Sequence, residues 1–400
     1  MSQPHHRAAI SHGTSHGVSQ RRPGVALALA IGAIVVIGAL IAGVFFASTQ
    51  EYRIGRNSLL ETRALTATEY GMYAMVATAG SIADSGWNTQ WNGMLGNGQM
   101  VTRVYSPGSG ATDTVRLTRL NTKDFLLVSE GIATLGGTSD AEARRRIGAL
   151  VTLATPNMKF LGALTSRGAT KIGGSSLIDG NDHVYSGWGC PAAGPALPGL
   201  TVQDVSMVST SGCKSLSCLD GDPKVAEDPA AADTSTYFQY GDMDWATLTA
   251  SASKIIPAGG SPGGVAPQLN ADGTCNTTPL GNWGDPTKAG ACANYFPIIY
   301  AKGDLSLSGG IGQGILLVEG DLSVQGGAEF FGPVIVRGML KTTGTGGHFN
   351  GGVMAANVDL DQNTVLGNAV INYSSCVLNA ALTAAATPML AGQRAWVELF

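Results

Sequence analysis

The sequence predicts an α+β protein that is mainly β. A long amino-terminal helix, transmembrane in its first part and amphipathic in its second, precedes a β-rich head whose carboxy-terminal part is parallel β-solenoid-like. Three observations lead to this prediction. An uncharged apolar run extends from Val25 to Ala47. Glycine supplies 56 of the 400 residues, about twice its usual share, and only 13% are charged, which favours turns and strands. Strand-like segments repeat every 17 to 19 residues near the carboxyl end.

The apolar run Val25–Ala47 is long enough to cross a membrane. At about 1.5 Å per residue, its 23 residues span a hydrocarbon core of about 30 Å as a helix. It is longer than the apolar part of a secretory signal, and it follows Arg21 and Arg22. We therefore predict one transmembrane helix over 25–47.

The same helix is expected to continue to about residue 80. No proline occurs between Pro23 and Pro107, and Leu60, Ala64 and Ala67 recur at helical spacing. Gly80 and the Asp84–Gly86 segment are expected to end it. The predicted helix therefore covers 25–80, apolar in its first half and amphipathic in its second.

Segments around this run resemble a known family. The block Gly24–Ala30 covers the start of the run, and the polar segments Thr49–Asn57 and Arg63–Gly71 follow it. Together they resemble the amino-terminal segment of PilX-type type IV pilus assembly proteins. Members of that group are minor pilin-like subunits whose short basic leader is removed after a glycine by a prepilin peptidase. The resemblance implies a leader over 1–24 that is cleaved after Gly24.

The chain departs from the major-pilin pattern at the start of the expected mature chain. Val25 is its first residue, where phenylalanine is usual, and Leu29 stands where a fifth-position glutamate is expected. In a bundle of packed helices, such a glutamate faces a neighbour's amino-terminal ammonium, and a pair of this kind discriminates between registers. Leu29 cannot form that pair. A tip or initiating subunit does not need the pair, because it has no such partner below it.

The resemblance implies a non-enzymatic minor pilin-like subunit of a type IV pilus or a related secretion or assembly apparatus. Its partners would be other pilin or minor pilin subunits through the N-terminal helix, the inner membrane and the prepilin peptidase. The chain would be a single-pass inner-membrane protein with its carboxy-terminal head external, in the periplasm, at the cell surface or in a pilus. Two alternatives stay open: a signal-anchored surface adhesin, and a solenoid protein active on polysaccharide.

Composition and motifs exclude other classes. The net charge of −4 provides no broad basic field, so we expect no nucleic-acid partner. A phosphate-binding Gly-x-x-x-x-Gly-Lys-[Ser/Thr] loop does not occur, which excludes a P-loop motor ATPase on this chain.

Strands are expected in the pilin-like α/β region at 81–159. Thr114–Leu120 and Phe125–Ser129 have the composition of paired strands, and Asp140–Leu153 is either an amphipathic helix or a strand. A pilin-like domain would pack such a sheet on the second half of the helix.

Six cysteines lie after the apolar run and none before it. An even number on one side of a membrane suits an oxidising compartment, where disulfides persist. Spacing favours two local pairs, although six cysteines allow 15 connectivities, and no spacing fits a zinc site. The disulfide candidates are Cys190, Cys213, Cys218, Cys275, Cys292 and Cys376, of which Cys213 with Cys218 and Cys275 with Cys292 are the local pairs.

The repeat in region 296–378 is aligned on five anchor residues. If each segment is a strand kinked at its anchor, the residues at −4, −2, +2 and +4 face one side, and 16 of these 20 are hydrophobic. A stack of parallel coils explains such a ladder better than an antiparallel sandwich does. Asp359 and Asp361 interrupt it, which indicates a slipped register or a bulge. The anchors are Gly303, Gly320, Gly338, Asn357 and Ser374.

An earlier coil is expected between Leu164 and Gly180, with residues from about His183 to Tyr295 as a long decoration. The region 160–295 is therefore predicted to be β-rich with long cysteine-containing loops, and 379–400 to be a carboxy-terminal tail.

Apparent catalytic and metal motifs are weak. Gly259–Gly263 fits Gly-x-Ser-x-Gly but lies in a Pro/Gly-rich loop rather than between a strand and a helix. Asp179–His183 and Asp220–Asp222 contain clustered oxygens, yet neither fits an EF-hand loop, and turn formation is the default. We therefore expect no catalytic residue, no metal, no cofactor and no enzymatic activity.

Overall fold

The computed structural model describes residues 25–79, 96–108, 110–121, 123–134, 142–358, 362–391 and 396–399. The chain divides into two compact units, Met1–Thr62 and Arg63–Phe400. Each is described by itself below. The predicted leader over 1–24, including Gly24, lies outside the described residues.

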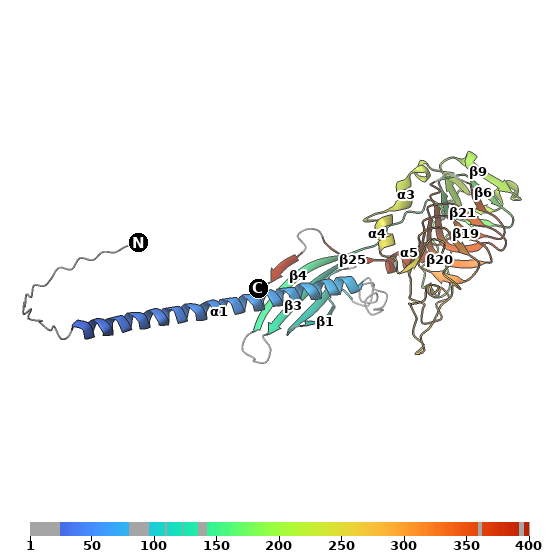
Figure 1. The fold of residues 1–400 in the computed structure, drawn as a ribbon. Helices are drawn as coiled ribbons and strands as arrows, with labels where there is room; N and C mark the ends of the chain where they lie inside the picture. Colours follow the sequence, from blue (N-terminus) through green and yellow to red (C-terminus); the bar gives the residue numbers. More distant parts are fainter. Residues whose placement is uncertain are drawn as a thin grey trace, which may run out of the picture. The chain divides into compact units, whose positions relative to one another are not determined.

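Helix α1 (Val25–Ala79) is continuous over 55 residues (Figure 1). The prediction of one unbroken helix is confirmed. Gly80 and Asp84–Gly86, where the sequence predicts its end, lie outside the described residues. From Arg63 onward the helix belongs to the second unit, where Ala64, Ala67 and Met75 are buried.

An antiparallel sheet packs against this last part of α1. Its strand order is β1-β2-β3-β4-β25, and β26 also pairs with β4. The inward residues of β2 and β3 form an apolar core with Met72 and Met75 of the helix. The predicted pairing of Thr114–Leu120 with Phe125–Ser129 is confirmed, and the described part of the predicted Asp140–Leu153 segment, from Glu142 onward, is a strand. The strands are β1 (Met100–Gly108), β2 (Ala111–Arg119), β3 (Asp124–Thr134), β4 (Glu142–Ala154), β25 (Thr387–Leu390) and β26 (Trp396–Leu399).

Most of the other strands form a parallel stack with three faces, which we call the parallel stack. Each complete turn of the chain contributes strand residues to all three faces, and the long strands β20 and β22 each continue from the third face into the first. The first face contains, in spatial order, β11 (Val225–Glu227), β8 (Leu200–Val202), β5 (Leu164–Ser166), the end of β22 (Gly347–Ala355), the end of β20 (Ala328–Val336), β18 (Ile315–Val318), β15 (Ile298–Ala301) and β14 (Lys254–Ile256).

The second and third faces are built in the same way. The second face contains β9 (Val208–Ser211), β6 (Thr170–Gly173), β23 (Asn363–Val365), β21 (Leu340–Thr342), β19 (Leu322–Val324) and β16 (Leu305–Leu307). The third contains β10 (Leu219–Asp220), β7 (Leu177–Asp179), β24 (Val370–Tyr373), the starts of β22 and β20, and β17 (Ile311–Gln313).

Spatial order and chain order differ in the parallel stack. The chain enters at β5, and the next turns add β8 and β11 on one side of it. Segment 228–253 then leads to the opposite end, where β14 pairs with β15. The following turns return until β22 lies beside β5, so the last complete turn contacts the first. The whole parallel stack is therefore inserted in the chain between β4 and β25.

The predicted inward ladder is confirmed for the first three anchors. Ala301, Val318 and Val336 align across neighbouring strands. Leu305, Leu322 and Leu340 align on the second face. These side chains are all buried.

At the fourth anchor, Asn357, the ladder holds before the anchor, where the buried Val353 and Ala355 align with Val334 and Val336, and it fails after the anchor. Asp359 and Asp361 lie outside the described residues, and the strand that pairs with β21 is β23, so Val365 faces inward there. Extra residues after Asn357 shift the register, so Asn363 and Val365 hold the inward positions of β23.

The last anchor, Ser374, caps a helix instead of kinking a strand. β24 pairs with the start of β22 on the third face. The predicted inward residues Cys376 and Leu378 belong to α5 (Ser375–Ala384) rather than to a strand, because the Ser374 hydroxyl accepts the Val377 N–H and starts that helix.

The sequence predicts that the segment His183–Tyr295 is a long decoration, but the structure shows that it is also part of the parallel stack. It supplies β8, β9, β10, β11 and β14 to the parallel stack. The short elements between them are η2 (Val205–Met207), η3 (Lys214–Leu216), η4 (Pro229–Ala232), α3 (Thr234–Phe238), β12 (Gln239–Tyr240), β13 (Met243–Asp244) and α4 (Trp245–Ala250). Side chains of α3, α4 and α5 pack on the outer side of the first face, where Tyr237, Leu248 and Leu378 join Leu317 and Met354 in an apolar cluster.

Candidate functional site

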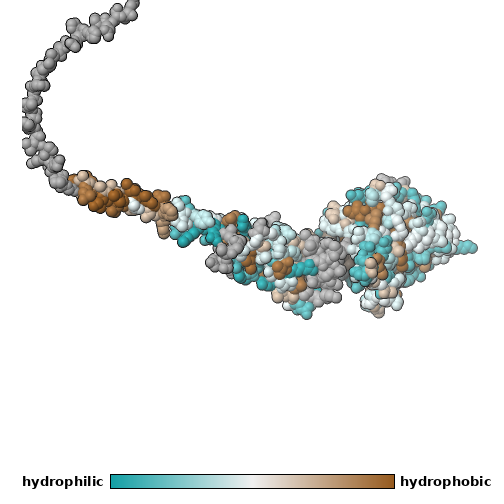
Figure 2. All heavy atoms as spheres, turned by 60° about the horizontal axis from the view of Figure 1, so that its bottom comes forward, coloured by the Kyte–Doolittle hydropathy of each residue, from teal (hydrophilic) through white to brown (hydrophobic). Residues whose placement is uncertain are grey.

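The apolar part of α1 is the largest exposed hydrophobic surface among the described residues. No charged side chain occurs between Val25 and Gln50, and the large side chains point outward all round the helix. Leu29 is 69% exposed and Phe45 is 76% exposed. Figure 2 shows this segment as continuously hydrophobic. Its length and composition suffice to cross a bilayer, and it contains the predicted boundaries Val25 and Ala47.

A buried polar cluster joins the second part of α1 to the sheet. Gly131 N–H donates to the Thr68 hydroxyl at 2.9 Å, and the Ser129 hydroxyl lies 2.8 Å from the Thr68 carbonyl oxygen. Ser129 Oγ is also 2.9 Å from each carboxyl oxygen of Asp113, which is fully buried. Gly71 of the helix leaves the room that Asp113 occupies, because a Cβ there would lie 1.5 Å from Asp113 Oδ2.

This geometry suits a protonated Asp113. One serine hydroxyl has a single proton, so Ser129 cannot donate to the Thr68 carbonyl and to an ionised Asp113 at once. A protonated Asp113 donates to Ser129 Oγ, which then donates to the helix. Burial, opposed by the Ser129 hydrogen bond, raises the pKa of Asp113 from 3.8 to about 6.

Asp113→Asn is expected to remove a pH dependence of stability. Because the folded-state pKa is raised, the protonated form stabilises the fold; this stability is present below about pH 4 and is lost as pH rises through about 6. A shift of about two units corresponds to about 3 kcal/mol. Thermal unfolding at pH 4 to 7 should show the wild type losing stability relative to Asp113→Asn, while the surface variant Asp242→Asn follows the wild type. Parallel curves for wild type and Asp113→Asn would contradict this.

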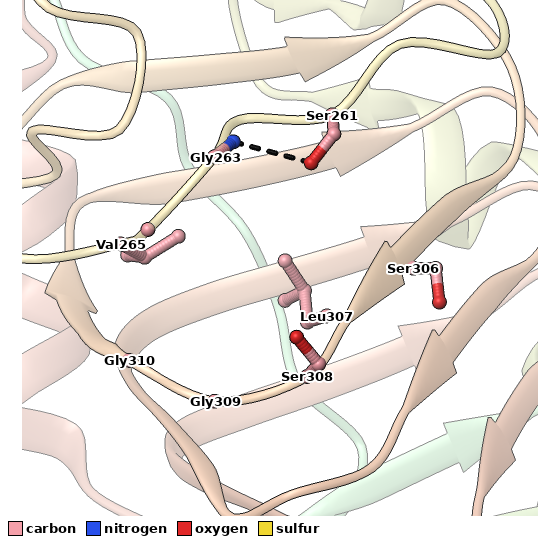
Figure 3. A pocket seen from close by; sticks show the side chains of 9 residues that line it. Ser261, Gly263, Val265, Ser306, Leu307, Ser308, Gly309 and Gly310 are labelled. Carbon is pink, nitrogen blue, oxygen red and sulfur yellow. Dashed lines mark hydrogen bonds between the residues drawn. The ribbon is translucent and has the colours of Figure 1, made fainter.

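The Gly259–Gly263 motif borders a shallow hollow of about 320 Å³ beside β16 (Figure 3). Ser261 Oγ accepts the Gly263 N–H at 3.1 Å, which closes a local turn. None of the residues that line the hollow has an acidic, basic or imidazole group, so Ser261 has no general base there. They are Ser261, Gly263, Gly264, Val265, Ser306, Leu307, Ser308, Gly309 and Gly310.

Two loops cover the third face of the parallel stack. Trp188 stacks on Phe331 with ring centroids 5.6 Å apart, and Tyr185 donates to Asn350 Oδ1 at 2.6 Å. Lys288 Nζ lies 3.8 Å from the centre of the Trp188 ring and donates to Gln313 Oε1 at 2.6 Å. Burial lowers the pKa of Lys288 to about 8. These contacts hold the two loops against each other and against the strands.

All six cysteines are paired. Cys213 is bonded to Cys218 and Cys275 to Cys292. The third bond joins Cys190, in a loop over the third face, to Cys376 at the start of α5. The two cysteines are 186 positions apart, so the bond connects the loop that follows the first turn of the parallel stack to the segment that leaves it after β24.

The oxygen-rich Asp179–His183 segment makes internal contacts. Asp179 accepts from Asn181 N–H and lies 2.9 Å from His183 Nε2, and Asp182 accepts from Ser375 N–H and from Gly194 N–H. Among the described residues, no group of three His, Cys, Asp or Glu side chains is placed to hold a metal ion.

Comparison with known proteins finds a weak similarity to a solved pilin structure. No protein family matches this chain, and no curated protein sequence matches it. The crystal structure of the competence-associated pilin ComZ from Thermus thermophilus aligns over 86% of this chain and 97% of that one, with 11% identity and a TM-score of 0.23. A TM-score of this size does not establish a shared fold, so it assigns no family to the chain.

Proposed function

We propose that this chain is a non-enzymatic minor pilin-like subunit of a type IV pilus or a related secretion or assembly apparatus. Its apolar helix anchors it in the inner membrane and later packs beside the helices of other pilin or minor pilin subunits. Its head, which we propose to be a pilin-like domain carrying an inserted β-solenoid, lies on the external side.

One observation carries this proposal. The single helix α1 is apolar and exposed over Val25–Ala47, yet beyond Arg63 it is buried against an antiparallel sheet. Soluble proteins rarely expose apolar patches above a few hundred Å². The exposed half therefore requires an apolar environment, and both a bilayer and a bundle of similar helices provide one.

A further observation supports the location. Three disulfides in the head fit an oxidising compartment rather than the cytosol.

The proposal is tested at Gly24. We expect mass spectrometry of membrane-extracted protein to find a mature chain that begins at Val25. The change Gly24→Arg should block a prepilin peptidase and leave the leader attached, while the control Gly17→Arg, inside the leader, should still be processed. An intact leader in the wild type would contradict the pilin assignment and leave the signal-anchored adhesin.

A further inference from the structure

The second face of the parallel stack presents a continuous row of side chains to solvent. On the first face the outward side chain of Leu317 is fully buried, and on the third Asn350 is 3% exposed. On the second face every outward side chain at the centre of a strand is exposed or partly exposed. This face is therefore available to a ligand along its whole length.

The outward side chains of the second face form one row. Strand register aligns a single residue from each of the six strands, and neighbouring strands in a sheet are about 4.8 Å apart. Lys341 and Lys171 are separated by one strand, so their backbones lie about 10 Å apart with Thr364 between them. The row is Ser306, Ser323, Lys341, Thr364, Lys171 and Ser209.

The row is cationic and rich in hydroxyl groups. Lys341 Nζ lies 3.4 Å from Asp321 Oδ2, which partly balances its charge. Among the described residues, Lys171 has no ion-pair partner within 4.0 Å. The row itself contains no carboxylate and no aromatic ring. Its charge is therefore complementary to an anionic ligand, and its hydroxyls can both donate and accept hydrogen bonds.

We propose that the second face binds an extended acidic polysaccharide that lies along this row. Each sugar of an extended polysaccharide adds about one strand spacing to the length of the chain. A chain with a carboxylate on alternate sugars therefore presents one carboxylate to Lys341 and the next to Lys171, and the sugar between them faces the hydroxyl of Thr364.

Other polymers fit the row less well. Single-stranded nucleic acid is usually held by aromatic side chains on which bases stack, and the row has none. Tight protein interfaces are anchored by buried Trp, Tyr or Arg side chains, which the row also lacks. Binding of an acidic polysaccharide is an activity beyond the proposed role as a pilin-like subunit. This binding does not depend on leader processing or on fibre assembly.

The test uses the full-length chain in detergent micelles and a hyaluronan decasaccharide, in which glucuronate alternates with an uncharged sugar. We expect binding that weakens with added salt. Lys171→Gln should reduce affinity about tenfold, and Lys171→Gln with Lys341→Gln about 100-fold, because each removes a charge-assisted hydrogen bond. Lys224→Gln, an exposed lysine outside the row, is the matched control and should bind like the wild type.

Three outcomes would overturn the proposal. They are absence of hyaluronan binding, equal binding of the neutral sugar chitohexaose, and tighter binding of a single-stranded oligodeoxynucleotide. Unchanged thermal unfolding of the variants verifies that a lost affinity reflects the removed lysines. An uncleaved leader would overturn the proposed function and leave this result unaffected.

Discussion

Replacing Leu322 by aspartate is expected to destabilise the parallel stack by about 5 kcal/mol, because burial of a leucine is lost and an unpaired carboxylate is placed in an apolar core. Leu322 is fully buried and lies between Leu305 and Leu340 in the inward ladder. Thermal unfolding and limited proteolysis of the head measure the change.

The neighbouring residue supplies the matched control. Ser323 faces outward on the same strand, so Ser323→Asp adds the same charge one position away and should change stability by less than about 1 kcal/mol. If Leu322→Asp and Ser323→Asp melt alike, the alternation of inward and outward residues on β19 is wrong.

A single methyl group at Gly131 is expected to separate α1 from the sheet. A Cβ at this position would lie 2.2 Å from the Ala64 carbonyl oxygen and 2.7 Å from the Thr68 nitrogen, both backbone atoms of the helix. Neither atom can move without the whole helix, so Gly131→Ala should cost about 3 kcal/mol or more. Hydrogen exchange of the β2 and β3 amides measures this loss.

Gly55 is the control for this substitution. A Cβ there meets nothing within 4 Å, and alanine has the higher helix propensity, so Gly55→Ala should leave the sheet unchanged and slightly stabilise the helix. Unaltered exchange in Gly131→Ala would show that the helix and the sheet are not in close contact.

Patterns within a short stretch of sequence predict the elements whose contacts are between residues close in the chain. The apolar run and the absence of proline predict α1 up to Ala79, and regular spacing predicts the ladder through Leu305, Leu322 and Leu340. The ladder fails after Asn357, because extra residues at one corner change the spacing while the register of pairing continues. Spacing alone carries no information about where a corner is lengthened.

Contacts between distant segments could not be predicted from the sequence. The pairing of β5 with β22 joins residues almost 190 positions apart, and no repeat spacing links them. For the same reason the row containing Lys171 and Lys341 is invisible in the sequence, and Cys190 with Cys376 has no local signal. The coil formed by β8, β9 and β10 was missed because its strands are short and separated by irregular loops.

The position of β5 beside β22 has a mechanical consequence. Both connections of the parallel stack to the sheet, before β5 and after β24, leave from neighbouring turns in its interior rather than from its two ends. A pulling force transmitted through these connections therefore acts on two neighbouring turns, at β5 and at β24, and not on the two ends of the parallel stack. The Cys190–Cys376 bond adds a covalent path beside them. Under tension the insert cannot be unwound turn by turn from a free end.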